Sequence, residues 1–355
     1  MTPRSRPRLV LAAAVASVAT LTLALALLGV RVAGTGTDGS SASTTAASVP
    51  TTSVPAPTST TEPAPAPAST AAITTTTSPA PATTTGAGGQ EAVLLAAGDI
   101  ASCSSSGDEA TAALLAARPS AVVATLGDNV YERGTPEEFS RCYAPSWGAA
   151  KPRTRPSPGN HDYGASGAAG YFGYFGAAAG DPAKGYYSYD LGPWHVVALN
   201  SNCSIVSCER GSAQETWLRA DLAAHPRSCT LAYWHHPRFS SGTVHGSTTA
   251  VAPLWQALHD ANADLVLAGH EHHYERLGPL GPSGALDPVR GVRSFVVGTG
   301  GRSHYAFGGA IAGSEVRHRG TFGVLELVLQ AKGFTWQFVP EPGDSFSDSG
   351  SAPCH

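Results

Sequence analysis

The sequence is poor in charge, and lysine is scarce among its basic residues. Only 14% of the 355 residues are charged, and the formal net charge is −4. Lysine occurs only at Lys151, Lys184 and Lys332. A nucleic-acid-binding domain usually carries a basic stripe or a high isoelectric point. The composition therefore argues against a nucleic-acid partner, and no segment indicates a protein partner.

The first 33 residues combine arginines with a long uncharged run. Arg4, Arg6 and Arg8 precede residues 9–30, which are mostly Leu, Ala and Val. The apolar region of a signal peptide has about 7–15 residues, whereas a membrane-spanning helix needs roughly 20. Arg31 interrupts any clean cleavage site. Two interpretations of residues 1–33 stay open: a signal peptide, or an uncleaved membrane anchor with a cytoplasmic N-terminus. Both predict an exported protein, secreted or held at the cell surface.

Residues 34–90 lack nearly all charge and consist mainly of Thr, Ser, Ala, Pro and Gly. Such a segment cannot bury enough apolar surface to offset the entropy of ordering it. We expect a disordered, extended linker. Its composition also fits an O-glycosylated stalk, and that alternative stays open.

Cysteine and histidine are both missing from the first hundred residues. An even number of cysteines in an exported chain suggests disulfides, although six cysteines allow 15 pairings. No pair has the CxxC spacing typical of a zinc site. We expect Cys203–Cys208 as a local clip, with Cys103–Cys142 and Cys229–Cys354 as the other two bonds. All 13 histidines follow residue 160, and this clustering is a first hint of a metal site.

Residues 91–355 alternate short apolar runs with helical patterns, which predicts an α/β fold with a mixed sheet. The expected helices cover residues 108–118, 212–225 and 250–262, and a hairpin is expected over 321–339. The expected strands cover residues 92–97, 121–126, 194–199, 230–234, 263–268 and 294–297. Several of these strands end in Asp, Asn or His. Ligands of open α/β sheets bind outside the carboxyl ends of strands, so we expect these residues to lie together.

Five short motifs carry the chemistry, and each is weak alone. His270 and His272 are two apart, which places both imidazoles on one side of an extended chain and suits chelation. In chain order the motifs are Gly98-Asp99-Ile100, Gly127-Asp128-Asn129-Val130-Tyr131, Gly159-Asn160-His161-Asp162, His235-His236-Pro237 and Gly269-His270-Glu271-His272.

Together the motifs resemble the calcineurin-like metallophosphoesterase superfamily, and within it the purple acid phosphatase branch. That branch shows GDxG, GDxxY, GNH[ED], a later His and GHxH. The chain departs only at the last Gly of the first motif, where Ala101 stands. The resemblance implies an α/β/β/α sandwich of two mixed sheets flanked by helices, with residues 91–355 as the catalytic domain.

The resemblance also implies a dinuclear metal site. Asp128 would bridge both ions. The first ion would be completed by Asp99, Tyr131 and His272, and the second by Asn160, His235 and His270. Two close cations need an anionic bridge, and a phenolate favours trivalent iron. We therefore expect iron paired with zinc, manganese or a second iron.

Two further histidines receive roles by resemblance. His161 is similar to the residue that contacts the phosphoryl group and protonates the leaving oxygen, and His245 to a histidine near the substrate. Asp162 is expected to orient a ligand histidine. Alternation along a strand would let only one of His235 and His236 face the metals, and the motif selects His235. A substrate-facing His236 is the alternative.

The predicted function is hydrolysis of phosphomonoesters on phosphorylated small molecules, by a metal-activated hydroxide that attacks phosphorus. Two alternatives remain. The same site could prefer phosphodiesters or nucleotides, or the chain could be a catalytically silent binding protein at the cell surface.

Overall fold

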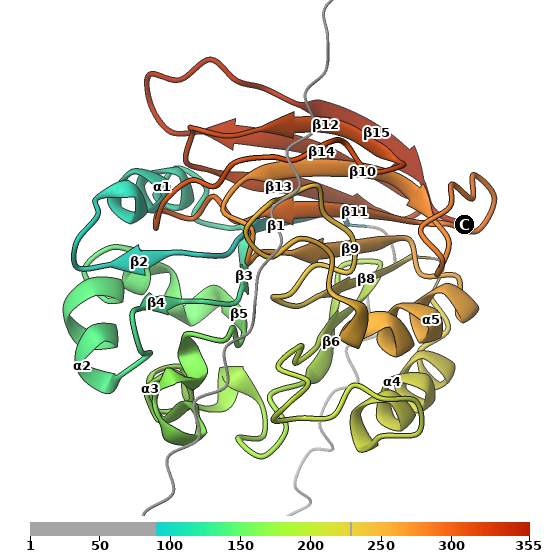
Figure 1. Ribbon diagram of the computed structural model, residues 1–355, viewed down its shortest axis with the longest axis horizontal. Helices are drawn as coiled ribbons and strands as arrows, with labels where there is room; N and C mark the ends of the chain where they lie inside the picture. Colours follow the sequence, from blue (N-terminus) through green and yellow to red (C-terminus); the bar gives the residue numbers. More distant parts are fainter. Residues whose placement is uncertain (1–89, 228) are drawn as a thin grey trace, which may run out of the picture. The chain divides into compact units, whose positions relative to one another are not determined.

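The computed structural model describes residues 90–227 and 229–355 (Figure 1). The predicted signal peptide or anchor at residues 1–33, with its possible membrane span at 9–30, and the linker up to residue 89 lie outside the described residues. Within the described ranges, no helix is both long and apolar enough to cross a membrane.

Two mixed sheets form the centre of the domain (Figure 1). The first has the order β15 (Ser349–Pro353), β14 (Gly333–Pro340), β13 (Gly323–Gln330), β1 (Ala92–Ala97), β3 (Val122–Leu126) and β5 (Thr154–Ser157). The second has the order β12 (Ser314–His318), β10 (Tyr274–Leu280), β11 (Val292–Val297), β9 (Leu265–Ala268), β8 (Thr230–Tyr233), β7 (Trp194–Ala198) and β6 (Tyr187–Leu191). A small parallel pair joins β2 (Ala101–Ser102) to β4 (Val130–Tyr131).

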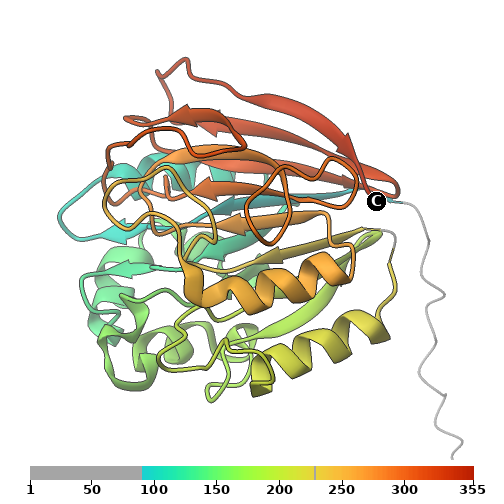
Figure 2. The same cartoon turned by 45° about the vertical axis from the view of Figure 1, so that its right-hand side comes forward.

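Helices cover the outer faces of the two sheets. Figure 2 shows α4 (Ala213–Ala224) and α5 (Ala252–Asp260) next to each other against the second sheet. The first sheet carries α1 (Gly107–Ala116), which contacts β13. The remaining helical segments are α2 (Pro136–Glu138), α3 (Ala169–Phe175), a π-helical segment at Phe139–Tyr143 and 3₁₀ segments at Trp147–Arg153, Asp162–Gly164, Ser166–Ala168, Gly176–Ala179 and Thr249–Val251.

The alternation of side chains along β8 explains the layers. Leu231 and Tyr233 belong to the core that the two sheets share, whereas Ala232 belongs to the core beneath α4 and α5. Leu218 of α4 and Trp255 of α5 fill that outer core and are fully buried. Burying a side chain of this size stabilises the fold by about 1.5–3 kcal/mol. The predicted α/β/β/α sandwich is confirmed.

Local predictions agree with the structure to within a few residues. The expected strand at 92–97 coincides with β1, and the expected hairpin is β13–β14, which turns at residues 331–332. All three expected disulfides are present: Cys103–Cys142, Cys203–Cys208 and Cys229–Cys354.

Parallel pairing brings the ends of the central strands to one edge. β1, β3 and β5 run parallel, as do β7, β8, β9 and β11. The two sheets also meet there through hydrogen bonds. The Gly98 N–H after β1 donates to the Val297 carbonyl of β11 at 2.9 Å, and the His235 ring contacts the Leu126 carbonyl of β3 at 2.8 Å.

Candidate metal centre

Three residues at this edge have left-handed backbone. The φ angles of Asp99, Asp128 and His270 are 61°, 47° and 70°. Residues other than glycine rarely adopt this conformation, which costs about 1–3 kcal/mol, and such strain concentrates at functional sites. Each of the three directly follows a glycine. These turns point the side chains inward at the ends of β1, β3 and β9.

Two glycines of the motifs are required because neighbouring carboxylates lie too close to them for any side chain. A Cβ on Gly159 would lie 2.1 Å from Asp128 Oδ1, and a Cβ on Gly269 would lie 2.7 Å from Asp99 Oδ2. Neither distance is compatible with a side chain. The glycines therefore let separate strand ends pack directly against the carboxylates.

One group of side chains gathers around the Tyr131 hydroxyl, which lies 2.9 Å from Asp99 Oδ1, 3.0 Å from Asp128 Oδ2 and 3.2 Å from His272 Nε2. His272 Nε2 also lies 3.2 Å from Asp99 Oδ1. Burial, followed by the charges of the two aspartates, raises the pKa of Tyr131 well above its ordinary value. Without a cation, the phenol therefore stays protonated and donates to a carboxylate.

A second group gathers around His235 Nε2, which lies 3.2 Å from Asp128 Oδ2, 3.1 Å from Asn160 Oδ1 and 3.1 Å from His270 Nδ1. The other ring nitrogen, Nδ1, faces the Leu126 carbonyl at 2.8 Å and must donate to it. Nε2 thus faces two oxygen atoms and the ring nitrogen of His270, whose donor or acceptor role depends on its tautomer. A single hydrogen bond from Nε2 cannot serve both oxygens, whereas a cation can bind both oxygens together with neutral imidazoles.

The electrostatics of the second group also favour a cation. Burial lowers the pKa of His235, but the Asp128 carboxylate outweighs it and raises the value to about 9. Burial alone would raise the pKa of Asp128, yet His235 holds it below its usual range. Burial and the neighbouring His235 keep the pKa of His270 well below its ordinary value, which leaves a neutral imidazole. Carboxylates, neutral imidazoles and an amide oxygen fit zinc, iron or manganese.

All seven predicted ligands meet at this edge. Asp128 Oδ2 contacts a member of each group, since it lies 3.0 Å from the Tyr131 hydroxyl and 3.2 Å from His235 Nε2. The arrangement can therefore hold two cations that share the Asp128 carboxylate.

His161 and His245 both lie beside this cluster. The His161 ring lies 4.4 Å from that of Tyr131, and its Nδ1 contacts the Glu132 carbonyl at 2.7 Å, which leaves Nε2 for another partner. The His245 ring stacks on His270 at 3.9 Å. Burial lowers the pKa of His245.

Two expectations about neighbouring residues are wrong. Alternation predicted that His236 would point away from His235, but its ring centroid lies 4.4 Å from that of His270. The reason is that β8 ends at Tyr233, so the alternation does not extend to the histidines. Asp162 was expected to orient a histidine. Instead it accepts hydrogen bonds from the Gly159 N–H at 2.8 Å and the Asn129 side chain at 2.9 Å, and so supports the turns that carry Asp128 and Asn160.

Sequence reasoning missed several contributors to the site. Ser303 contacts His272 Nδ1 at 2.7 Å, and Tyr305 stacks on the same ring at 3.9 Å. Glu271 is fully buried and accepts the His245 N–H at 2.7 Å. Ser303 and Tyr305 follow the end of β11, so the strand-end rule could have pointed to their segment. Nothing in the sequence pattern pointed to Glu271.

Comparison with known proteins agrees with this geometry. The family model of calcineurin-like phosphoesterase matches residues 92–274. Purple acid phosphatase 15 of Arabidopsis thaliana is 34% identical over 121 residues, which cover 33% of this chain and 22% of that protein. An uncharacterized protein of Mycobacterium tuberculosis is 31% identical over 147 residues, which cover 33% of this chain and 28% of that protein. The chain thus spans about a quarter of the length of these curated relatives.

Two solved structures support the fold alone. Purple acid phosphatase PPD1 from yellow lupin (Lupinus luteus) seeds superposes with a TM-score of 0.59 at 17% identity, covering 74% of this chain and 53% of that chain. GAP50, described as the anchor in the inner membrane complex of Plasmodium, superposes with a TM-score of 0.56 at 14% identity, covering 75% of this chain and 89% of that one.

Proposed function

This chain belongs to the calcineurin-like phosphoesterase family, and we propose on that basis that it is a dinuclear metal-dependent hydrolase of phosphomonoesters. The observation that carries the proposal is the contact of Asp128 Oδ2 with both groups of donor side chains. The purple acid phosphatases among its relatives support the same class of reaction.

The residues fit two different cations. Asp99, Tyr131 and His272 would hold one, Asn160, His235 and His270 would hold the other, and Asp128 would contact both. The phenol of Tyr131 favours a trivalent iron in the first position, and the imidazoles of the second suit zinc, manganese or iron. Iron paired with one of these three is therefore the metal content that we propose.

The chain supplies binding and proton transfer around the phosphoryl group. When bound, such cations supply an acidified water and neutralise charge on the phosphoryl oxygens. His161 Nε2 would donate to a phosphoryl oxygen or protonate the leaving oxygen, and the contact of Nδ1 with the Glu132 carbonyl supports this role because it leaves Nε2 available. His245 stacks on His270, and we expect it to contact the same substrate.

The test combines metal analysis with a panel of substrates. Protein purified without chelator should contain two metal ions per chain and release phosphate from a monoester such as p-nitrophenyl phosphate. Slower hydrolysis of bis(p-nitrophenyl) phosphate would agree with a monoesterase, and faster hydrolysis would make the chain a phosphodiesterase. Protein with neither metal nor activity would instead be a silent binding protein.

The proposal includes export to the outside of the cell. Its support among the described residues is the set of three disulfides, because such bonds persist mainly in oxidising compartments. Fractionation of the native host would test it. The protein should appear in the medium or on the cell surface, and protein confined to the cytoplasm would contradict the proposal.

A further inference from the structure

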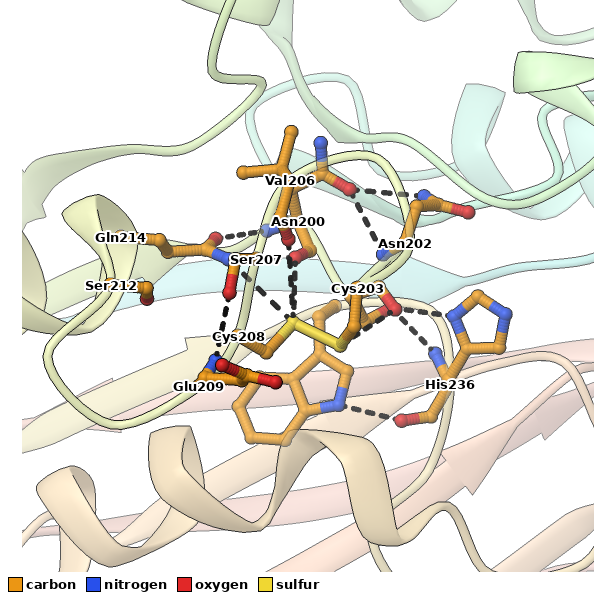
Figure 3. The surroundings of a disulfide bond; sticks show 12 residues. Asn200, Asn202, Cys203, Val206, Ser207, Cys208, Glu209, Ser212, Gln214 and His236 are labelled. Atoms are coloured by element: carbon orange, nitrogen blue, oxygen red, sulfur yellow. Dashed lines mark hydrogen bonds between the residues drawn. A yellow bond between two sulfur atoms is a disulfide. The ribbon is translucent and has the colours of Figure 1, made fainter.

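The loop that follows β7 lies beside the metal centre but is not part of it. It contains Asn200-Ser201-Asn202, a strand-end motif that the seven ligands leave unused. Figure 3 shows this loop with the Cys203–Cys208 disulfide and with His236 against it. Ser201 and Asn202 are buried, at 3% and 5% exposure, so the loop is part of the packed interior.

Hydrogen bonds fix the form of the His236 ring. The Ser201 hydroxyl oxygen accepts the backbone N–H groups of His235 at 3.2 Å and His236 at 2.9 Å. Its one hydrogen is therefore free to donate to His236 Nδ1, which lies 2.8 Å away. Because Nδ1 then accepts, the neutral ring carries its hydrogen on Nε2.

His236 is also held by its backbone. The Trp234 indole N–H donates to the His236 carbonyl at 2.7 Å, so the residue is fixed at its N–H, its carbonyl and its ring. The ring centroid lies 4.4 Å from that of His270 and 4.9 Å from that of His235. An N–H donor with a fixed direction therefore stands beside two of the ligands that would hold the second cation.

The loop that directs Ser201 is itself rigid. The Gln214 side chain from α4 pairs with both backbone groups of Asn200, at 2.8 and 2.9 Å. Asn200 Oδ1 accepts two hydrogen bonds from Asn202, at 3.1 and 3.0 Å. The Cys203–Cys208 disulfide then closes the loop with a sequence separation of only five residues. A hydroxyl held in this way has a single orientation.

We propose that His236 is a substrate-binding residue whose Nε2–H donates to a phosphoryl oxygen, and that Ser201 positions it. The inference rests on the proposed phosphoesterase function. An uncharged donor suits this place, because it adds a bond to an anionic substrate without adding a charge that would repel the neighbouring cation. Arginine or lysine would bind phosphate more strongly but would oppose metal binding.

The test uses a set of substitutions that separate the two ring nitrogens. The amide nitrogen of glutamine can reach the position of His236 Nε2, whereas that of asparagine reaches the position of Nδ1. His236→Phe and His236→Asn should weaken binding of inorganic phosphate about tenfold, the effect of losing one hydrogen bond to a charged group. His236→Gln should stay near the wild-type affinity. Metal content by mass spectrometry should remain two ions per chain in all three variants.

Ser201 is tested with a matched control from the same loop. Ser201→Ala should raise KM several-fold with little change in kcat, and Ser201→Thr should restore KM because it keeps the hydroxyl. Ser207→Ala, the same change at an exposed position, should behave as wild type. If His236→Phe fails to fold, Ser201→Ala and its threonine rescue still decide the question.

Three results would overturn the inference. Unchanged phosphate affinity in His236→Phe would show that His236 makes no contact with phosphate. Loss of a metal ion in that variant would make His236 a metal ligand. Equal phosphate affinities of the asparagine and glutamine variants would show that Nε2 has no role. Because phosphate binding is measured without turnover, a wild-type protein that binds phosphate but hydrolyses no ester would contradict the proposed function and not this one.

Discussion

Two clusters of histidine and aspartate within residues 90–227 and 229–355 differ in how their polar atoms are paired. In the first, at the strand ends, His235 Nε2 faces Asp128, Asn160 and His270. In the second, His195 Nε2 faces Asp221 at 2.8 Å and His195 Nδ1 faces Asp190 at 3.2 Å. Each nitrogen of His195 thus faces a different carboxylate, and Asp221 also accepts from Ser188 while Asp190 pairs with Arg227.

This difference determines what each cluster needs. Although burial lowers the pKa of His195, Asp221 and Asp190 outweigh it and raise the value above the ordinary one. A protonated His195 therefore satisfies its cluster without any ion. In the strand-end cluster the oxygens of Asp128 and Asn160 both face one ring nitrogen, His235 Nε2, an arrangement that the proposed cation would satisfy. Residue types alone do not identify a metal site, since both clusters have atoms close enough to bind one.

The largest expected effect comes from removing one carboxylate charge at the strand ends. Asp128→Asn should lose both cations and reduce phosphate release at least about a thousandfold, because about 4 kcal/mol of transition-state stabilisation goes with them. Metal analysis and phosphate release measure it. The matched control is Asp221→Asn, the same change in the other cluster, which should keep both metals. Equal metal loss in the two variants would contradict the inference that only the strand-end cluster binds the cations.

Removing His195 from the second cluster should lower stability and leave catalysis unchanged. His195→Phe leaves the buried Asp221 carboxylate without its main partner, so the free energy of unfolding should fall by about 3 kcal/mol. Urea denaturation measures the loss. Metal content and kcat should match the wild type, and a metal-depleted variant would show that His195 belongs to a metal site after all.

The stability that His195 supplies should depend on pH. Because its pKa is raised on folding, the contribution is complete below about 6.5, the unfolded value, and is lost as pH rises through the folded value. The pKa of Asp221 is lowered, despite burial, by its bond to His195. The stability that the Asp221 carboxylate contributes is therefore lost only as pH falls through that lowered pKa. The difference in unfolding free energy between wild type and His195→Phe should therefore be larger at pH 6 than at pH 9. Equal differences would argue against a protonated His195.

Of the two substitutions at proposed ligands, Tyr131→Phe is expected to have the smaller effect on turnover. Tyr131→Phe should abolish the visible charge-transfer band of iron-loaded protein and slow phosphate release by about tenfold or less, because carboxylate and imidazole ligands remain at that ion. Absorption spectroscopy measures the band. Tyr305→Phe is the control, since that ring stacks on His272 and its hydroxyl is no expected ligand. A band that survives in Tyr131→Phe would show that Tyr131 is not a ligand.

The sequence predicted the parts of the site that strand ends carry. Apolar runs followed by Asp or His pointed to Asp99, Asp128, His235 and His270, because parallel strands end at one edge. The family resemblance completed the set with Tyr131, Asn160 and His272. The prediction for His236 was wrong for a local reason: the strand stops two residues before the histidine pair, and alternation stops with it.

Residues that act through long-range packing were beyond sequence reasoning. Ser303 reaches His272 across a sequence separation of 31 residues, and Asp162 supports Asn129 across 33. No periodicity relates such positions, and only the assembled sheets bring them together. The strands β6, β12 and β15 were missed for a related reason, since they lie at sheet edges and lack the continuous apolar runs of the central strands.

The Cys229–Cys354 disulfide joins the two sheets covalently. Cys229 directly precedes β8 in the second sheet, and Cys354 directly follows β15 at the edge of the first. A loop of this length restricts the unfolded chain and stabilises the fold by about 2–5 kcal/mol. Recombinant protein made in a reducing cytosol would therefore lack this disulfide. We expect β15 to detach from the sheet more easily in such protein and to become accessible to proteases. The metal centre should therefore be assayed in protein expressed in the periplasm or in another oxidising compartment.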